Sequence, residues 1–436
     1  MSRKKPSSRG GGDRQYTVSI VRGDDIVDRV TKAIELVGGM AKFVKKGDKV
    51  LIKVNLVDGS PYETGETVHP ETVRTIVKMA KAAGASQVLA GDAITSWDMT
   101  LYDAVAAIVR EEGGEWVNLD KSPRAEVTVK NPVFFENLKV AKELVECDVL
   151  INAGVLKTHH LAGATVAVKN MYGVLDMQDR MNYHHLDRIE EVIVDLNLVK
   201  PASLVVVDGG YSTHHQPAFE VHKMDLAMAG NNAILVDAVA AKIMGADPKA
   251  LRYLRWAEER GLGSADIEKH RIVGLTIEEA FRTKTVNNVD FVNRESQNVK
   301  IINGGACTGC YGRLSTMLLH EHDINSAKAK LYVLMGPQAK PPAPMEEGSA
   351  CILCGNCLAP TFYNNLKGTF VPGCPPSLED FKQALSKYLA PRKRLSRREW
   401  QKILKKMEKR GFKSPHGPPP FLPPRPTGEE GHGPPF

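Results

Sequence analysis

The chain has 436 residues, of which 42% are hydrophobic and 25% are charged, the balance of a globular protein with two or three domains. No apolar run approaches the ~20 residues of a membrane-spanning helix. The basic N-terminus is not followed by an apolar stretch, so neither a transmembrane segment nor a secretory signal is expected. We therefore expect a cytoplasmic protein whose thiols stay reduced.

The net charge of +7 is concentrated at the two ends of the chain. Residues 1–14 hold five Lys or Arg against one acid, and residues 391–436 hold twelve against four, so the remainder is mildly acidic. We predict a disordered basic tail over 1–14, a basic helix over 391–414 and a disordered proline-rich tail over 415–436. The basic C-terminal tail could bind a redox partner protein; a nucleic-acid partner is not expected, because only the tails would support it.

Strand-like and helix-like segments alternate along the first 300 residues. Buried strands are predicted at 16–21, 49–57, 87–91, 115–118, 148–153 and 203–208, and helices at 24–46, 70–84, 100–112, 186–199 and 233–245. Pro70 at the first turn and Gly84 after the last turn mark the ends of one helix. This alternation predicts an α/β domain over 15–300, with an open, mostly parallel sheet flanked by helices.

From residue 301 the composition changes, and Gly, Cys and Pro interrupt the periodic pattern. We predict a small, irregular, cysteine-rich domain over 301–390, which ends in a short helix over 378–390. Six of the seven cysteines of the chain lie in this region: Cys307, Cys310, Cys351, Cys354, Cys357 and Cys374.

The two-residue spacing of these cysteines predicts a metal centre. A C-x2-C turn brings two thiolates to one centre, and the triplet followed by a distant Cys-Pro is typical of ferredoxin-type ligand runs. We expect a 4Fe-4S cluster, in one centre or two. It could use the triplet with Cys374, or the first pair with Cys357 and Cys374, or all six thiolates could serve two centres. Zinc bound by two C-x2-C units is the alternative.

A group of polar residues follows the predicted strand at 148–153. Lys157, His159, Lys169 and Asn170 lie within the segment KTHHLAGATVAVKN, at an edge of the sheet where open α/β folds bind ligands. The two lysines favour an anionic small molecule that carries a phosphate or carboxylate. His159 and Lys169 are the candidate catalytic residues.

Three other strand ends carry polar residues that we expect to share this pocket with Lys157. They are Asn55, Asp92 and Asp208. His69 opens the helix that begins at Pro70, where it could bind an anion or cap the helix.

Several of these segments resemble the domain-of-unknown-function 362 family. They are KVNLV at 53–57, VHPETVR at 68–74, GASQVLAGD at 84–92, VLINAGVLKTHHLAGATVAVKNMYG at 149–173 and ILVDAVAAKIMGADP at 234–248. The resemblance implies that Lys157, His159, Lys169, Asn170 and Asp237 occupy characteristic positions, and that an iron–sulfur segment is joined to the domain. The chain departs from the family at YSTHHQPAFEV (211–221), where members usually have a glycine- and proline-rich stretch.

HHLAGATVAVKN at 159–170 is also similar to the lactate racemase family. In that family the corresponding lysine holds a nickel pincer cofactor, which would place His159 or His160 and Lys169 at such a site.

These observations predict an iron–sulfur oxidoreductase, or a redox-linked cofactor enzyme, of anaerobic metabolism. An electron-transfer or assembly subunit of a larger complex, a metal-cofactor enzyme similar to racemases, and a zinc-stabilised binding protein are the alternatives.

Overall fold

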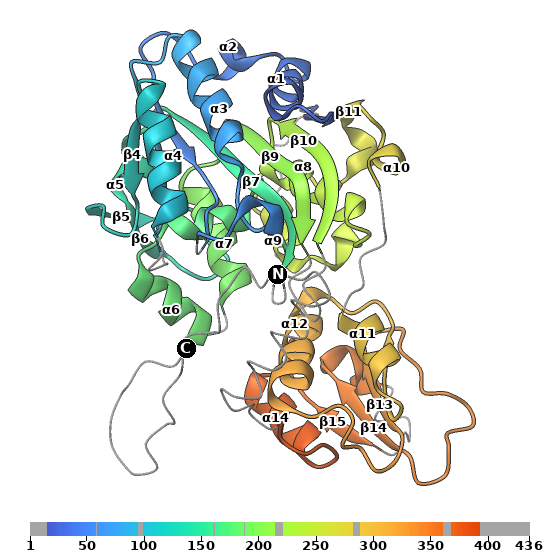
Figure 1. The fold of residues 1–436 in the computed structure, drawn as a ribbon. Coiled ribbons are helices and arrows are strands. Elements are labelled where there is room, and N and C mark those ends of the chain that lie inside the picture. The colour runs from blue at the N-terminus through green and yellow to red at the C-terminus, as the bar shows by residue number, and fades with distance from the viewer. Residues whose placement is uncertain are drawn as a thin grey trace, which may run out of the picture. The chain divides into compact units, whose positions relative to one another are not determined.

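The computed structural model describes residues 15–57, 59–94, 99–159, 162–186, 188–213, 221–281, 288–360 and 368–392. All of these residues belong to one compact unit that ends at Arg392 (Figure 1). The tails predicted at 1–14 and 415–436, and nearly all of the basic helix predicted at 391–414, lie outside the described residues.

A large sheet forms the framework of the α/β part of the chain. Its strands follow the order β11 (Arg271–Gly274), β1 (Thr17–Arg22), β10 (Val221–Gly230), β9 (Leu204–Thr213), β7 (Val149–His159), β2 (Lys49–Lys53), β3 (Gln87–Asp92) and β4 (Glu115–Asn118). From β9 to β4 all neighbouring strands are parallel, whereas β10 is antiparallel to both β9 and β1. The predicted open, mostly parallel sheet is confirmed.

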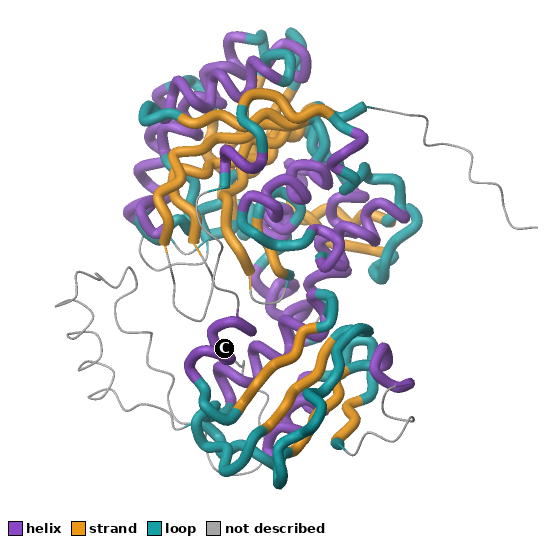
Figure 2. The backbone as a smooth tube through the Cα atoms, turned by 90° about the vertical axis from the view of Figure 1, so that its right-hand side faces the viewer, coloured by secondary structure: helices purple, strands orange, loops and turns teal. Residues whose placement is uncertain are grey.

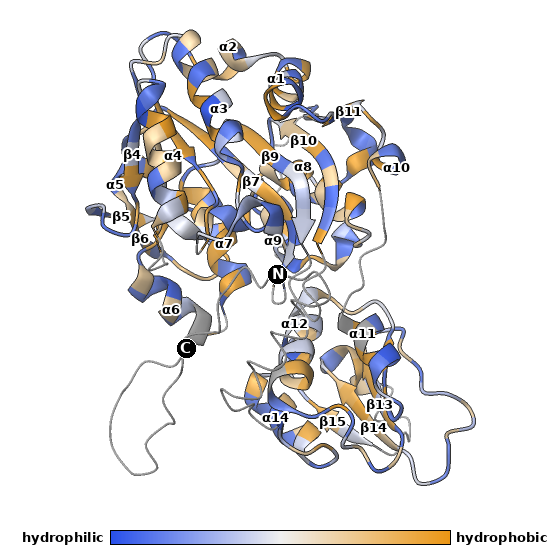
Figure 3. Ribbon diagram, in the orientation of Figure 1, coloured by the Kyte–Doolittle hydropathy of each residue, from blue (hydrophilic) through white to orange (hydrophobic). Residues whose placement is uncertain are grey.

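Helices cover both faces of this sheet, because successive residues of a strand point to opposite sides. In β2, Val50 and Ile52 belong to the apolar core shared with α1 (Ile26–Leu36), α3 (Pro70–Ala82) and α4 (Thr100–Glu111). Leu51 belongs to the other core, shared with α7 (Ile189–Val199) and α8 (Ala233–Ile243). Figure 2 shows the strands between helices, and Figure 3 shows how hydrophobic residues concentrate in the strands.

The ends of α3 agree closely with the prediction. The Nδ1 atom of His69 accepts a hydrogen bond from the N–H of Glu71, and Pro70 occupies the first turn, where its missing N–H costs nothing. Gly84 follows the end of the helix with a φ of +98°. The capped first turn fixes the loop between β2 and α3 against the edge of the sheet.

Shorter elements surround the large sheet. They are α2 (Met40–Phe43), the hairpin of β5 (Arg124–Thr128) and β6 (Asn137–Ala141), α5 (Lys142–Glu146), β8 (Gly163–Thr165), α6 (Met177–His185), α9 (Arg252–Glu259) and α10 (Ile277–Ala280). Strand β7 runs to His159 and pairs with β8 as a hairpin. The polar segment that follows residue 153 therefore begins as a continuation of the strand and a second strand, rather than as a loop.

The cysteine-rich region is more regular than expected. It contains a sheet of four parallel strands in the order β12 (Val299–Asn303), β13 (Leu331–Met335), β14 (Ala350–Cys354) and β15 (Thr369–Val371). The helices of this region are α11 (Asn288–Glu295), α12 (Thr308–Thr316) and α14 (Leu378–Ser386). Its apolar cores draw on residues 289–389. Short apolar strands thus lie between the glycines and prolines that suggested an irregular chain.

In the part of the chain that the structure describes, no helix has the length and apolar character needed to cross a membrane.

Candidate functional site

A buried ion pair joins the ends of two neighbouring parallel strands. The Nζ atom of Lys53, the last residue of β2, lies 2.6 Å from Oδ1 of Asp92, the last residue of β3. The Asp92 carboxylate also accepts the N–H groups of Leu56 and Ala93. Burial lowers the pKa of Lys53, and the charge of Asp92 opposes this effect. Removing either partner would leave the other charge buried and unpaired, which is strongly destabilising. The pair therefore holds the loops that follow both strands.

Asparagine side chains extend this network to β7. The Oδ1 atom of Asn170 accepts from Asn55 Nδ2 at 3.0 Å, and its Nδ2 donates to Oδ1 of Asn152 at 2.8 Å. Lys157, within β7, donates from Nζ to Asn55 Oδ1 at 3.2 Å and to the carbonyl of Glu66 at 2.6 Å. The structure therefore brings Asn55, Lys157 and Asn170 together, in a network whose positions are set by hydrogen bonds.

A cavity of about 210 Å³ opens above this network. Six of the residues predicted to form the site line it: Asn55, Asp92, Lys157, His159, Lys169 and Asn170. Gly173 closes one side of it, and a Cβ there would stand 2.5 Å from Asp92 Oδ1 and 2.7 Å from Lys53 Nζ. Only glycine fits beside the ion pair at this position.

The cavity is strongly basic. Lys53, Lys157, Lys169 and Arg180 line it, whereas Asp92 is its single lining carboxylate among the described residues. Arg180, on α6, is paired with Asp120 at 3.4 Å outside the cavity lining. An excess of positive charge attracts anions, and the anionic ligand stays a prediction.

Lys169 is the most unusual cation in the cavity. Burial lowers its pKa to about 7, and the charges of Lys157, Arg180 and Lys53 add to the effect. Among the described residues its ammonium group has no hydrogen-bond or ion-pair partner; it lies 5.5 Å from the centre of the Tyr172 ring. A large fraction of Lys169 is therefore an uncharged amine at neutral pH, the form that acts as a nucleophile or base.

The β7–β8 hairpin supplies two further polar groups. His159 accepts a hydrogen bond at Nδ1 from the N–H of Ala162. The hydroxyl of Thr165, on β8, is buried and has no hydrogen-bond partner among the described residues. A buried hydroxyl that lines a cavity without a partner is a free contact for a ligand.

Asp237 does not line the cavity but accepts a hydrogen bond from the backbone near Lys169, which lines it. From α8 its Oδ1 accepts the N–H of Ala167 at 2.7 Å, and its Oδ2 accepts the hydroxyl of Tyr253 at 2.9 Å. Burial raises the pKa of Asp237 to about 7. Because Ala167 lies two residues before Lys169, Asp237 positions the backbone that carries the lysine.

His69 and Asp208 lie in a separate cluster. The Oδ2 atom of Asp208 accepts the backbone N–H of His69 and the hydroxyl of Thr72, and its Oδ1 lies 3.9 Å from Arg29. His69 acts as the cap of α3, as one of its two predicted roles required. Neither residue lines the cavity of Lys169, which Asp208 was expected to share with Asn55, Asp92 and Lys157.

Seven lining residues were absent from the sequence-based set, and four of them have polar side chains: Lys53, Thr165, Tyr172 and Arg180. Lys53 stands within the apolar run at 49–57, and a lysine in a strand buried on both faces was the sign that could have revealed it. Arg180 and Tyr172 follow the polar segment, where the sequence alone gives no sign of their direction.

The ends of the small sheet carry the cysteines. Cys307 follows β12, Cys357 follows β14, and Cys374 follows β15. Cys310 lies one helical turn after Cys307 in α12. Because all four strands are parallel, these residues converge on one edge of the sheet, beyond the strands' carboxyl ends.

The four thiols are close enough to affect one another. Burial raises the pKa of Cys310 to about 12, and the charges of Cys307, Cys357 and Cys374 each add to the rise. A Cβ on Gly355, whose φ is +93°, would stand 3.1 Å from the sulfur of Cys310 and 3.7 Å from that of Cys357. Burial raises the pKa of Cys357, and the N–H of Gly336, directly after β13, donates to its sulfur and opposes this rise.

Cys351 and Cys354 have different surroundings. They lie in β14 itself, three residues apart, so their side chains point to opposite faces of the sheet. Cys351 packs with Tyr332 and Leu353 in one core, and Cys354 packs in the other, with both thiols buried. Cys354 lies within electrostatic range of Cys310 and Cys357, and burial is the main cause of its raised pKa.

All seven cysteines are free thiols in this structure. Among the described residues, no three His, Cys, Asp or Glu side chains converge closely enough to hold a single metal ion. Cysteines that bind a four-iron cluster each hold a different iron atom, so their sulfurs need not meet at one point.

Comparison with known proteins identifies the α/β part of the chain. Residues 50–242 match the family described as domain of unknown function (DUF362), and the predicted family resemblance is confirmed. A curated relative, the thylakoid-associated protein sll1697 of Synechocystis sp., is 26% identical over 255 residues, which are 54% of this chain and 75% of that protein.

Two solved structures share low similarity with the chain. The lactate racemase apoprotein of Thermoanaerobacterium thermosaccharolyticum is 12% identical, with a TM-score of 0.35 over 85% of this chain and 89% of that one. Sp1610 of Streptococcus pneumoniae, a putative tRNA (m1A22) methyltransferase, is 13% identical, with a TM-score of 0.19 over 58% of this chain and 100% of that one.

Proposed function

We propose that this chain is an iron–sulfur protein in which Cys307, Cys310, Cys357 and Cys374 bind one four-iron cluster, and that its α/β part binds a small anionic molecule near Lys169. The observation that carries the proposal is the convergence of these four thiols beyond the ends of the small parallel sheet. Of the three groupings that the sequence left open, this geometry supports the first pair with Cys357 and Cys374.

The chemistry of the donor set supports an iron–sulfur cluster. Thiolates are the ligands of such clusters, and backbone N–H groups that point at sulfur tune their potentials. The N–H of Gly336 makes such a contact with Cys357. Burial raises the pKa values of Cys310 and Cys357, and the charges of neighbouring cysteines add to the rise, so a bound cation would favour the loss of their protons. When bound, the cluster would supply one-electron transfer.

The cavity of Lys169 supports an anionic substrate or cofactor. Its lysines and arginine outnumber its single carboxylate among the described residues, and the free hydroxyl of Thr165 offers a hydrogen bond. A phosphate or carboxylate there would be held by charge-assisted hydrogen bonds, which are stronger than neutral ones. Asp92 holds the ammonium group of Lys53 in place, so this positive charge stays at the wall of the cavity.

A second candidate function is covalent chemistry at Lys169. The lowered pKa of this lysine favours it, since an uncharged amine can attack a carbonyl group or carry an attached cofactor, as the racemase-like alternative requires. The intact mass of the protein purified from its own source should then exceed the sequence mass. The excess should map to Lys169, and an unmodified Lys169 would contradict this candidate.

Metal and sulfide analysis tests the main proposal. The full chain should be purified without oxygen, and its iron, acid-labile sulfide and zinc should be measured together. We expect about four irons and four sulfides per chain, with a spectrum that bleaches on reduction. Stoichiometric zinc without iron would contradict the proposal and favour the zinc-stabilised alternative.

A further inference from the structure

A second, larger cavity lies beside one of the proposed cluster ligands. Its volume is about 630 Å³, and Cys374, with the residues up to Leu378, forms one wall. The other walls come from the 133–134 loop, the start of α7 and helix α9 of the α/β part. Nothing in the proposed function uses this cavity.

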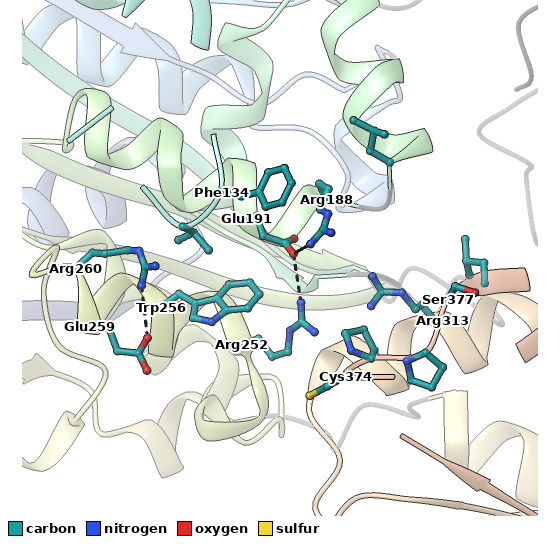
Figure 4. A pocket seen from close by; sticks show the side chains of 15 residues that line it. Phe134, Arg188, Glu191, Arg252, Trp256, Glu259, Arg260, Arg313, Cys374 and Ser377 are labelled. Carbon is teal, nitrogen blue, oxygen red and sulfur yellow. Dashed lines mark hydrogen bonds and ion pairs between the residues drawn. The ribbon is translucent and has the colours of Figure 1, made fainter. Parts of the chain in front are cut away.

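Arginines dominate its lining. Arg188, Arg252, Arg260 and Arg313 face two glutamates, Glu191 and Glu259. Glu191 is shared by two of them, at 2.9 Å from Arg188 and 3.9 Å from Arg252 (Figure 4). The charges that line the cavity therefore sum to an excess of two positive charges, which a small anion would balance.

Two aromatic rings stand among these arginines. The guanidinium of Arg188 lies 4.3 Å from the centre of the Phe134 ring, and that of Arg252 lies 4.5 Å from the centre of the Trp256 ring. Guanidinium groups stacked on rings in this way keep their edge N–H groups available for in-plane hydrogen bonds. Such a surface recognises a flat ring system and an oxyanion at once.

The walls of the cavity are held in place before any ligand binds. The carboxylate of Asp195 accepts the N–H groups of Val133, Phe134 and Phe135, which fixes the loop that carries Phe134. Arg252 is fixed by Glu190, whose Oε2 lies 3.2 Å from its Nε. Rigid walls lower the entropy that binding must overcome.

The same arginine reaches the cysteine centre. A Cβ on Gly309, between Cys307 and Cys310, would stand 2.4 Å from an Nη atom of Arg252 and 3.1 Å from Pro375. Arg252 therefore touches the backbone that carries two of the four thiols, while Cys374 itself lines the cavity. A molecule in the cavity would contact both.

We propose that this cavity is a second anion site, which holds a small molecule made of a flat ring and a phosphate or carboxylate group against Cys374. The anion site follows from the lining residues alone. Its position beside a redox centre rests on the proposed function, which would make the bound molecule a neighbour of the cluster.

Calorimetric titration with 1-naphthyl phosphate tests the site in the full chain as purified without oxygen. We expect saturable binding that quenches the fluorescence of Trp256, and weaker binding of both 1-naphthol and inorganic phosphate. Arg188→Gln should weaken binding at least about tenfold, because it removes a charged hydrogen-bond donor. Glu191→Gln should tighten binding, since it removes a negative charge from the lining.

Two matched variants separate binding in this cavity from binding elsewhere on the chain. Arg255→Gln also removes one arginine charge. Arg255 lies on α9 but outside the cavity lining, so this variant should leave the Kd unchanged. Lys169→Gln should also leave it unchanged, because that lysine lines the other cavity. No binding by the wild-type chain, or equal losses in Arg188→Gln and Arg255→Gln, would overturn the proposal, as would a loss confined to Lys169→Gln.

The outcome is distinguishable from that of the metal analysis. Binding with this pattern in a chain that contains no iron would sustain the anion site and remove the cluster from the proposed function. An iron-loaded chain that does not bind the probe would sustain the cluster and overturn the anion site. In the loaded chain, saturation with the probe should change the electron paramagnetic resonance signal of the reduced cluster, and an unchanged signal would contradict contact at Cys374.

Discussion

The large sheet and the small sheet of this protein both gather polar groups near the ends of parallel strands, but they do so in opposite ways. At the large sheet, Lys53 and Asp92 satisfy each other, and asparagines fill the remaining hydrogen bonds. At the small sheet, four thiols come together, and burial together with the charges of the other three raises the pKa of Cys310. Lys53, Asp92 and Asn170 find their partners within the folded chain, whereas the thiols are the ligands of the proposed cluster.

This contrast indicates which parts of the fold should depend on a cofactor. A network of amides, amines and carboxylates contributes to stability by itself, provided that every member is satisfied. A group of thiols contributes little until a metal binds, because metal binding and folding are then coupled. Removing the cluster should therefore disturb one sheet and spare the other.

The largest expected effect is the response to cluster removal. Treatment with oxygen and a chelator should remove a contribution on the scale of the ~10 kcal/mol that structural metal sites give to folding. Hydrogen exchange, followed by mass spectrometry, should speed up in the segments around residues 304–310, 355–358 and 372–376. Strands β2 and β7 should keep their protection. Equal protection in both sheets before and after treatment would contradict the contrast.

A smaller effect is expected when the buried ion pair of the large sheet is broken. Asp92→Ala leaves the Lys53 charge buried without its partner, which should lower the free energy of unfolding by about 3–5 kcal/mol. Urea unfolding of the full chain measures this change. Asp266→Ala is the matched control, because its ion pair with Lys269 lies on the surface, and it should have no measurable effect. Similar losses of unfolding free energy in both variants would show that the buried Lys53–Asp92 pair stabilises the fold no more than a surface ion pair does.

The pH dependence of Lys169 should be unusual without any loss of folding. Its pKa of about 7 means that the amine is charged below pH 7 and uncharged above it, whereas an ordinary lysine loses its proton near pH 10.4. Modification by an amine-reactive reagent, mapped by mass spectrometry, should therefore reach half its maximal rate near pH 7.

Arg180→Gln tests one cause of this lowered pKa. The positive charge of Arg180 lowers the pKa of Lys169, but less than burial does. The variant should therefore move the pH midpoint of the modification upward, by less than the shift that burial causes. A wild-type midpoint near pH 10 would show that Lys169 is an ordinary lysine. A midpoint that falls in the variant would contradict the contribution of Arg180.

Much of the large sheet could be predicted because its strands obey local rules. The helices at 70–82 and 100–111 and the strands at 87–92 and 115–118 begin and end close to their predicted positions. They do so because Pro, Gly and apolar periodicity act over a few residues. The antiparallel strand β10 is absent from the predicted elements, since His222, Lys223 and Asp225 interrupt its apolar pattern.

The small sheet could not be predicted because two patterns overlap in β14. The sequence ACILC contains two cysteines at ligand spacing and is also a continuous apolar run, typical of a strand buried on both faces. Ligand spacing favours Cys351 and Cys354 as a pair, but a strand sends them to opposite faces. Only the pairing of β14 with β13 and β15 shows which pattern the chain follows.

The most direct test compares iron content in two single-cysteine variants, Cys357→Ala and Cys354→Ala, purified side by side without oxygen. They remove the same atom three residues apart. Cys357 interacts with Cys307 and Cys374, whereas Cys354 is buried in an apolar core, within electrostatic range of Cys310 and Cys357. We predict that Cys357→Ala loses nearly all of its iron and that Cys354→Ala keeps about four irons per chain. Iron retained by Cys357→Ala and lost from Cys354→Ala would contradict the assigned ligands.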